Sequence, residues 1–169
     1  MGRPFISEPD DSHDLAALRT RLHAARERLA RLPVANDRHA GPTDPSTGEG
    51  WHRGNVLGHV NEMLPFWTEQ IRSAIKGSGN VGRDQEGATQ RRQGIDQGNA
   101  TTEGELRLSV DVGIERVLEL MEALSSDDLE RVVAYHSRDG DRDAQLGELL
   151  QLLIVGHLED HLAQLASLG

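Results

Sequence analysis

The segment GHLEDHLAQL, residues 156–165, places His157 and His161 four residues apart in a stretch that otherwise has the apolar spacing of a core helix. Leucines precede them at intervals of three and four: Leu146, Leu150 and Leu153. With about 100° between successive residues, these leucines and both histidines fall on one side of an α-helix. We therefore predict a helix from about Asp143, as its N-cap, to Leu168, with two imidazole rings at the centre of its apolar face.

Three further segments show the spacing of amphipathic helices. They cover residues 12–32, 53–76 and 102–124. Pro65 lies inside the second segment and predicts a kink, because proline removes one backbone hydrogen bond. Thr102 and Glu105 form a capping-box pattern at the start of the third. Gly113 lies on the apolar face of that helix and indicates a close helix approach or internal space, since glycine is unfavourable in a helix interior.

The connections between these segments are rich in glycine and charged residues. Residues 36–50 have the composition of turns. Residues 77–99 contain six glycines and predict a long loop with at most a short helical turn. Residues 131–143 predict a short extended, hairpin-like connection. We expect an all-α fold, a four-helix bundle with long connections, in a single domain over residues 1–169.

Paired histidines at positions i and i+4 of one helix can reach the same metal ion. A third ligand would come from another apolar face, and His59 lies on that of the second helix. His52, seven residues earlier, is a reserve candidate on about the same face. The alternative is that each ring is a core histidine bonded to a carbonyl or carboxylate. Glu159 and Asp160 do not match the order of acidic residues in the zinc-protease motifs HExxH and HxxEH.

The positions of these histidines also predict the directions of two helices. His59 lies about a quarter of the way along the second helix, whereas the midpoint of His157 and His161 lies past the middle of the fourth. With aligned starts, parallel helices would separate the two levels by about 13 Å along the axis, and antiparallel helices by about 5 Å. We therefore expect helices 2 and 4 to be antiparallel, with one long connection acting as a crossover.

Composition limits the partners of the chain. Its formal net charge of −10 disfavours nucleic acid or an anionic membrane surface as a partner. It has no cysteine, which excludes a cysteine nucleophile and disulfides. No segment approaches the roughly 20 apolar residues that a membrane span needs, and the N-terminal residues lack the apolar region of a signal peptide. We expect a soluble, cytoplasmic protein.

Two motifs together resemble the DinB-like superfamily of small metal-binding four-helix bundles. They are GWHRGNVLGHVNEMLPFW, residues 50–67, and LLIVGHLEDHLAQL, residues 152–165. The most specific features are Trp51 with His59 in the first motif and the pattern G-H-x-x-x-H-x-x-Q-L in the second. The resemblance extends from the first helix to the last turn. The superfamily includes damage-inducible-like proteins of unknown role and thiol-dependent enzymes, such as the metal-binding domain of mycothiol-dependent maleylpyruvate isomerase and bacillithiol S-transferases.

This resemblance implies a metal site at His59, His157 and His161. Members with a glutamate at the position of His157 also occur, so the set in this chain is neutral. Three imidazoles suit Zn²⁺ or Ni²⁺ better than Mg²⁺ or Ca²⁺, which favour oxygen ligands. The resemblance further implies a divalent-metal-dependent transferase or isomerase that uses a low-molecular-weight thiol. The alternative is a non-catalytic, metal- or ligand-binding bundle with a stress-related or sensing role. We expect a homodimer and a small-molecule substrate.

Several neighbours of the three histidines are candidates for supporting roles. Gln164 has the spacing to contact a ligand ring or a bound water, and Glu62 to accept a hydrogen bond from His59. Trp51 is expected to wall the pocket, and the pair Arg91–Arg92 to meet an anionic cosubstrate. Each has a simpler alternative, in which the side chain is solvated, packs in the core or bonds to the backbone. We expect Trp67 to be a packing residue.

Overall fold

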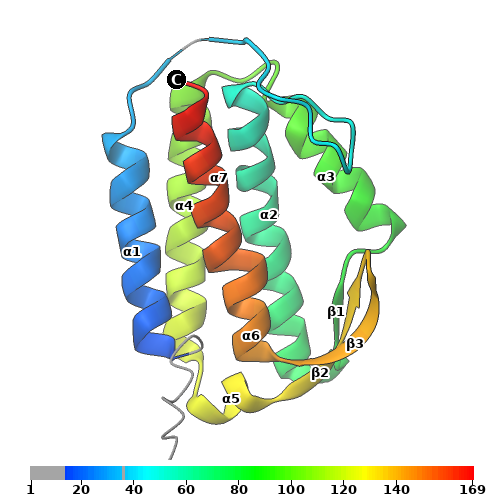
Figure 1. The fold of residues 1–169 in the computed structure, drawn as a ribbon. Coiled ribbons are helices and arrows are strands. Elements are labelled where there is room, and N and C mark those ends of the chain that lie inside the picture. Colours follow the sequence, from blue (N-terminus) through cyan, green and yellow to red (C-terminus); the bar gives the residue numbers. More distant parts are fainter. Residues whose placement is uncertain (1–13, 36) are drawn as a thin grey trace, which may run out of the picture.

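The computed structural model of the protein describes residues 14–35 and 37–169. It confirms the predicted four-helix bundle and adds a small sheet (Figure 1). The fourth helix is composite: two α-helical parts are joined by one wider, π-helical turn, Gln151–Val155. The bundle elements are α1 (Leu15–Arg31), α2 (Arg53–Ser73), α4 (Glu103–Ala123) and the composite helix of α6 (Leu146–Leu150) and α7 (Gly156–Ser167).

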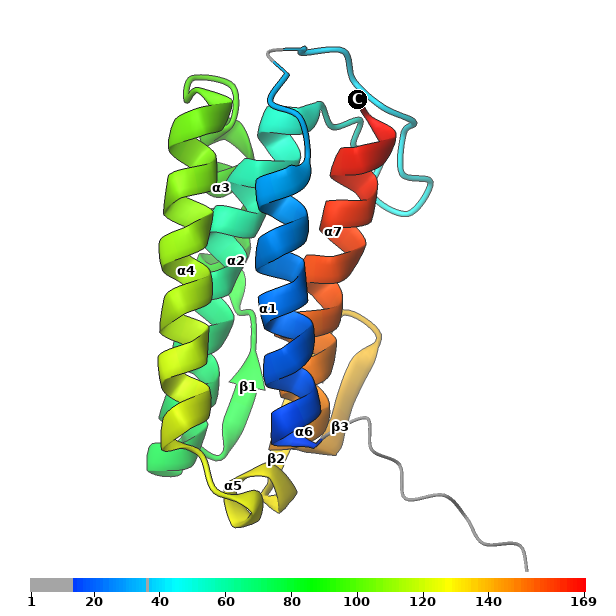
Figure 2. The same ribbon diagram turned by 90° about the vertical axis from the view of Figure 1, so that its left-hand side faces the viewer.

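The four helices run in two directions. α1 and the α6–α7 helix run one way, and α2 and α4 run the other (Figure 1). Seen from the side of α1, that helix lies between α4 and α7, with α2 behind them (Figure 2). The second and fourth helices of the bundle are therefore antiparallel, as predicted. The chain returns from the end of α2 to the start of α4 by a long crossover.

The crossover contains regular structure that was predicted as a loop. β1 (Asn80–Gly82) is followed by α3 (Gln85–Gln97), whose N-cap Asp84 accepts a hydrogen bond from the Gly87 amide at 2.8 Å. The glycines of α3 serve helix packing instead of loop flexibility. A Cβ atom on Gly58 of α2 would overlap the carbonyl oxygen of Gly94, so the two backbones are in direct contact. The prediction of a loop is wrong, because glycines in this segment allow close contact between two helices and do not mark a turn.

This close contact makes Gly58 sensitive to a single methyl group. We expect Gly58→Ala to destabilise the protein by about 1–3 kcal/mol, because the added Cβ forces α3 away from α2. Gly104, in the first turn of α4, is a matched control: a Cβ there would meet nothing within 4 Å. Urea unfolding of both variants tests this. Equal stabilities of Gly58→Ala and Gly104→Ala would contradict the account.

β1 of the crossover is an edge strand of a three-stranded sheet with the order β1-β2-β3. β2 (Val132–Ser137) pairs with β1 in parallel and with β3 (Gly140–Gln145) in antiparallel fashion. The short helix α5 (Ser126–Glu130) leads from α4 into β2. The hairpin predicted at residues 131–143 is confirmed. The prediction of Asp143 as the N-cap is wrong, because the β2–β3 ladder extends to Gln145 and the helix begins only at Leu146.

Other helix predictions can be compared residue by residue. The capping box is confirmed, since Thr102 accepts from the Glu105 amide and Glu105 accepts from that of Thr102. α2 continues through Pro65 as one α-helix and ends at Ser73, followed by a π-helical turn. Gly113 marks a close helix approach, because a Cβ there would lie 3.1 Å from Leu64 of α2.

The first helix begins at Leu15, after the N-cap Asp14. Its predicted start at Ser12 lies outside the described residues. None of the helices in the described part of the chain combines the length and the apolar character needed to cross a membrane. The prediction of one domain over residues 1–169 stays a prediction.

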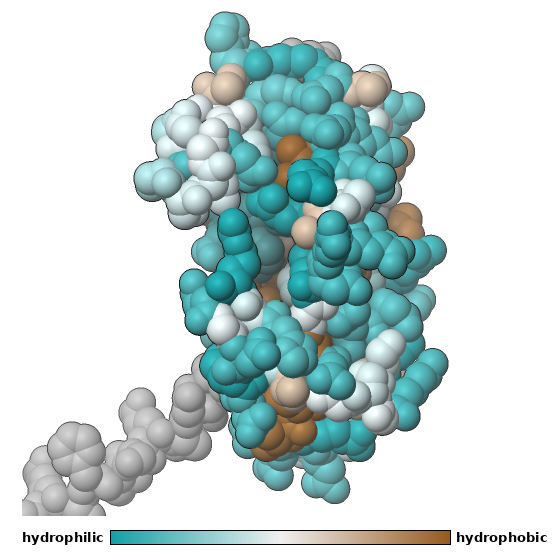
Figure 3. Space-filling model, turned by 90° about the vertical axis from the view of Figure 1, so that its right-hand side faces the viewer, coloured by the Kyte–Doolittle hydropathy of each residue, from teal (hydrophilic) through white to brown (hydrophobic). Residues whose placement is uncertain are grey.

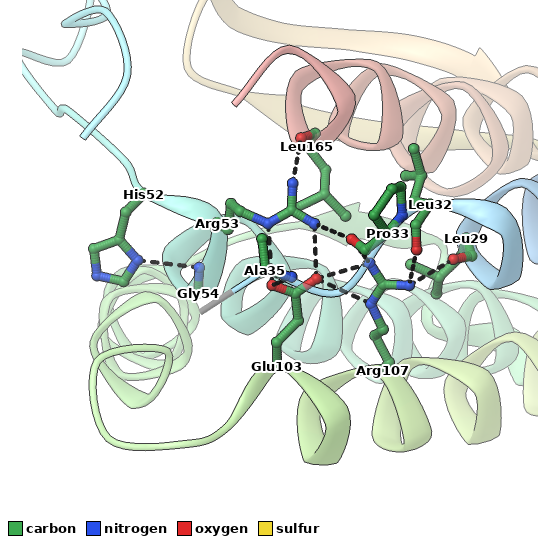
Figure 4. Close-up of polar contacts among 10 residues, drawn as sticks. All are labelled: Leu29, Leu32, Pro33, Ala35, His52, Arg53, Gly54, Glu103, Arg107 and Leu165. Atoms are coloured by element: carbon green, nitrogen blue, oxygen red, sulfur yellow. Dashed lines mark hydrogen bonds and ion pairs between the residues drawn. The ribbon is translucent and has the colours of Figure 1, made fainter. Parts of the chain in front are cut away.

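A buried ionic cluster, which we call the Arg53–Glu103–Arg107 clamp, holds one end of the bundle together (Figure 4). Arg53 donates to both carboxylate oxygens of Glu103, at 3.0 and 2.7 Å, and Arg107 donates to the same carboxylate at 2.7 Å. Burial alone would raise the pKa of Glu103, but hydrogen bonds from the two arginines outweigh it and hold the pKa below its ordinary value.

The clamp also satisfies the ends of two other helices. Arg53 donates to the carbonyl oxygens of Leu165 in α7 and Pro33 after α1, and Arg107 donates to that of Leu32. Positive side chains at helix C-termini are electrostatically favourable. Because Arg53 is the first residue of α2, the clamp fixes the start of α2 against the last turns of α7.

Candidate metal centre

The structure brings the three predicted histidines together. His59 lies in the second turn of α2, and His157 and His161 lie in the first two turns of α7. One ring nitrogen from each lies within 4.8 Å of the others, and Nε2 of His59 is 3.3 Å from Nε2 of His157. In residues 14–35 and 37–169, this is the one cluster of three or more histidine or acidic side chains with such a geometry.

The π-helical turn decides where the two histidines of α7 point. A uniform α-helix would place His157 and His161 at the centre of the apolar face, as predicted. The wider turn inserts one residue and rotates everything after it by about 100°. The buried positions of α7 are accordingly Leu158, Leu162 and Leu165, each at most 1% exposed. The histidines lie beside this core face and are only half-buried, so this part of the prediction is corrected.

Neighbouring groups fix the tautomers of the two α7 histidines. Nδ1 of His161 lies 2.9 Å from the amide oxygen of Gln164, which only accepts, so Nδ1 carries the proton. The His157 ring likewise donates a hydrogen bond to the backbone of Leu153. In both rings, the remaining nitrogen presents a lone pair. The predicted contact of Gln164 is confirmed for the ring of His161.

His59 is the most buried of the three, at 3% exposure. Its Nδ1 is buried and has no hydrogen-bond partner among the described residues; Oε2 of the Glu62 carboxylate is 3.8 Å away. A proton on Nδ1 faces that carboxylate and leaves the Nε2 lone pair directed at His157. With this tautomer of His59, three lone pairs converge without a donor among the described residues, which is an arrangement that a metal cation satisfies. The residues present fit a metal ion.

All three rings are neutral at pH 7. Burial lowers the pKa of His59 to about 2, with further lowering from His161 and His157, and it lowers the pKa of His157 to about 3. Burial also lowers the pKa of His161. Neutral imidazoles are the form that binds metals, so no proton has to be removed before an ion enters.

These pKa shifts predict that the metal-free protein loses stability as the pH falls from about 6.5 to 5. The unfolded histidines bind protons in this range, whereas folded His59 and His157, with pKa values of about 2 and about 3, do not, and the lowered pKa of folded His161 acts in the same direction. Stability rises with pH wherever the unfolded state binds more protons, by up to about 1.4 kcal/mol per pH unit for each histidine. Urea unfolding at several pH values measures the slope. A slope unchanged in His59→Gln would contradict this assignment.

Glu62, the predicted acceptor for His59, is held by a residue that the sequence did not single out. Arg83 donates to both oxygens of the Glu62 carboxylate, at 2.7 and 2.9 Å. Its guanidinium lies 3.9 Å from the centre of the Phe66 ring. The arginine therefore fixes the carboxylate behind His59. Arg83 precedes α3 in the segment predicted as a loop, and no sequence pattern linked it to Glu62.

Trp51 forms a wall of the site, as predicted. Its ring is stacked on His161, with centroids 5.7 Å apart, and lies 5.2 Å from His59. The guanidinium of Arg91 lies 5.5 Å from the Trp51 ring and is paired with Glu49 at 3.1 Å.

The other predicted residues have different positions. Arg92 is exposed and donates to Thr89, so it does not share the place of Arg91. His52 caps α2 by accepting from the Gly54 amide at 3.0 Å, and it is not part of the histidine cluster. Trp67 packs in the core, as expected, but it also lines the cavity described next.

A cavity of about 500 Å³ opens from the three histidines. Its walls come from the loop before α2, from α3, from the β2–β3 hairpin and from α7. The side of the molecule formed by α3 and the strands is mostly hydrophilic (Figure 3). Cavities of this size accommodate small organic molecules. The arrangement combines a cluster of metal-ligand side chains with space for a substrate beside it.

Comparison with known proteins agrees with this geometry. A family model described as the DinB superfamily matches residues 17–165. Searches among curated proteins and among solved structures found no match. The family and the three converging histidines fit a metal-binding protein. The match spans the bundle from α1 to the last turns of α7, and the chain belongs to the DinB superfamily.

Proposed function

We propose that the protein is a metal-dependent enzyme that binds Zn²⁺ or Ni²⁺ through His59, His157 and His161 and acts on a low-molecular-weight thiol. The observation that carries this proposal is the convergence of three neutral imidazoles at the wall of a cavity of about 500 Å³. An ion held by His59, His157 and His161 would keep a position for a further ligand and would lower the pKa of a water or thiol bound there.

The side chains of the cavity favour a thiol over water as the group that is deprotonated. Among the described residues, two carboxylates line the cavity. Asp44 is hydrogen-bonded to Ser46, and Glu49 is paired with Arg91. Neither is free to act as a strong general base. A thiol, with an ordinary pKa of about 8.5, loses its proton at pH 7 with much less help than water requires.

The residues around the cluster have distinct tasks in this proposal. Gln164 orients His161 through the hydrogen bond to Nδ1, and Trp51 stacks on the same ring and excludes water from one side. Arg83 and Arg91 are near enough to lower the pKa of His59 electrostatically, after burial and the other histidines. Their positive charge favours the thiolate form of a substrate in the cavity.

A thiol-consumption assay tests the enzyme proposal. The protein loaded with Zn²⁺ or Ni²⁺ is incubated with a low-molecular-weight thiol and an electrophile such as chlorodinitrobenzene. The chain itself contributes no thiol, since it has no cysteine. We expect consumption above background with the loaded protein and none with His59→Ala. Metal binding without thiol consumption or thiol binding would instead support the non-catalytic alternative.

The carboxylate behind His59 provides a second prediction about the site. We expect Glu62→Gln to weaken Zn²⁺ binding by about 10- to 100-fold, because the negative charge of Glu62, 3.8 Å from His59 Nδ1, favours the proton on that nitrogen and raises the basicity of the ring. Glu69→Gln, on the exposed side of the same helix, is the matched control. Competition with a chromophoric chelator gives both affinities. Equal affinities for the two variants would show that Glu62 has no such role.

A further inference from the structure

More guanidinium groups than carboxylates line the cavity, although the whole chain is negative. The formal net charge of the protein is −10, yet three guanidinium groups and only two carboxylates lie on the described cavity wall. They are Arg83, Arg91 and Arg138 against Asp44 and Glu49. The three histidines are neutral, so a divalent ion between them would add its full charge to this excess. Glu62, which pairs with Arg83 from behind, balances the excess in the metal-free protein, so a bound divalent ion would make the cavity positive towards a ligand.

Only one of these arginines is free of a carboxylate partner. Arg83 is paired with Glu62, and Arg91 with Glu49. Arg138, in the turn between β2 and β3, has no hydrogen bond or ion pair within residues 14–35 and 37–169.

Asp44, an acidic residue on which the charge of Arg138 acts, is already engaged. Asp44 accepts hydrogen bonds from the amide and the hydroxyl of Ser46, both at 2.7 Å. These bonds, more than the charge of Arg138, lower the pKa of Asp44. The charge of Arg138 therefore acts on the Asp44 carboxylate without a hydrogen bond or ion pair between the two described groups. The guanidinium of Arg138 is therefore the group on the cavity wall that is open to a ligand with acceptor oxygens.

We propose that the substrate thiol carries a carboxylate and that Arg138 binds this group while the sulfur lies at the three histidines. This inference rests on the proposed function. A planar guanidinium matches a carboxylate with two parallel hydrogen bonds, which favours this group over a neutral polar one. Arg138 and the three histidines line the same cavity.

A matched pair of thiols tests the proposal. Co²⁺-loaded protein is titrated with 3-mercaptopropionate and with 3-mercaptopropionamide, which has the same size and no charge. Each thiol binds as a thiolate and releases its proton to the buffer, and the thiolate-to-cobalt absorption band reports binding. We expect the carboxylate compound to bind about tenfold more tightly, as for one hydrogen-bonded charge pair. Arg138→Gln should remove this preference and leave the affinity for the amide unchanged.

Arg116→Gln is the control, because it removes the same charge from an exposed position on α4, away from the cavity. It should keep the preference. Equal affinities of the wild type for both thiols, or a preference that persists in Arg138→Gln, would overturn the carboxylate site while the metal–thiol proposal stands.

Absence of the absorption band with both thiols would instead reject the metal–thiol proposal. The carboxylate site is then decided by NMR of the metal-free protein titrated with 3-mercaptopropionate. A shift of the Arg138 Nε–H resonance with this compound, and not with the amide, supports the site. No shift overturns it.

Discussion

His161→Ala is expected to abolish the rise in melting temperature that Zn²⁺ or Ni²⁺ produces in the wild-type protein. A ligand that binds only the folded state at a hundredfold excess over its Kd stabilises by about 2.7 kcal/mol. For a chain of this size, that corresponds to a shift of roughly 5–10 °C. The variant lacks one of the three converging nitrogens, so we expect no shift. Circular dichroism melts of both proteins, with and without the ion, measure it.

The helices should survive this substitution. His161 is half-buried beside the core face, and its contacts are Gln164 and the rings of Trp51 and the other two histidines. We therefore expect metal-free His161→Ala to melt close to the metal-free wild type. His23→Ala, on the exposed side of α1, should retain the full shift. A metal-dependent shift in His161→Ala as large as in the wild type would contradict the assignment of His161 as a ligand.

Glu103→Ala is expected to destabilise the protein by about 3–5 kcal/mol. The substitution leaves Arg53, whose side chain is 4% exposed, with its charge buried and unneutralised. It also takes the carboxylate from Arg107, which then retains only backbone carbonyls as partners. Urea unfolding gives the free-energy difference.

A surface carboxylate on the same helix provides the control for this prediction. Glu119→Ala, at an exposed position of the same helix, should cost much less, since surface substitutions usually change stability by about 0.5 kcal/mol or less. A loss for Glu103→Ala no larger than for this control would show that the clamp does not hold the bundle together.

The helices and the three histidines were predictable because their signals are local. Apolar residues at intervals of three and four identify the bundle helices, and imidazoles at those intervals stand out from leucines. The antiparallel direction of α2 and α7 followed from where His59, His157 and His161 lie along their helices. Each inference needed only spacing within one segment and the condition that three side chains meet.

The remaining features depend on contacts between distant segments. α3 was missed because Gly94 and Gly98 pack against Gly54 and Gly58 of α2, a pairing that composition does not reveal. The π-helical turn Gln151–Val155 has no signal in the apolar spacing, because that spacing assigns the same rotation about the helix axis to every residue.

The two ionic pairings join residues that are far apart in the sequence. Each ion pair joins two different elements, so no periodic pattern connects its partners. The pairs are Arg83–Glu62 and Arg53–Glu103. Such pairs become visible only when the fold is known. They nevertheless position the site, one behind His59 and the other between α2 and α7.

Crystallographic location of the bound ion tests the central claim most directly. Crystals grown with Zn²⁺ are measured on both sides of the zinc absorption edge. We predict one anomalous peak at which His59, His157 and His161 each contribute one nitrogen at about 2.0–2.1 Å. A protein saturated with Zn²⁺ whose anomalous peaks all lie away from these three rings would contradict the account.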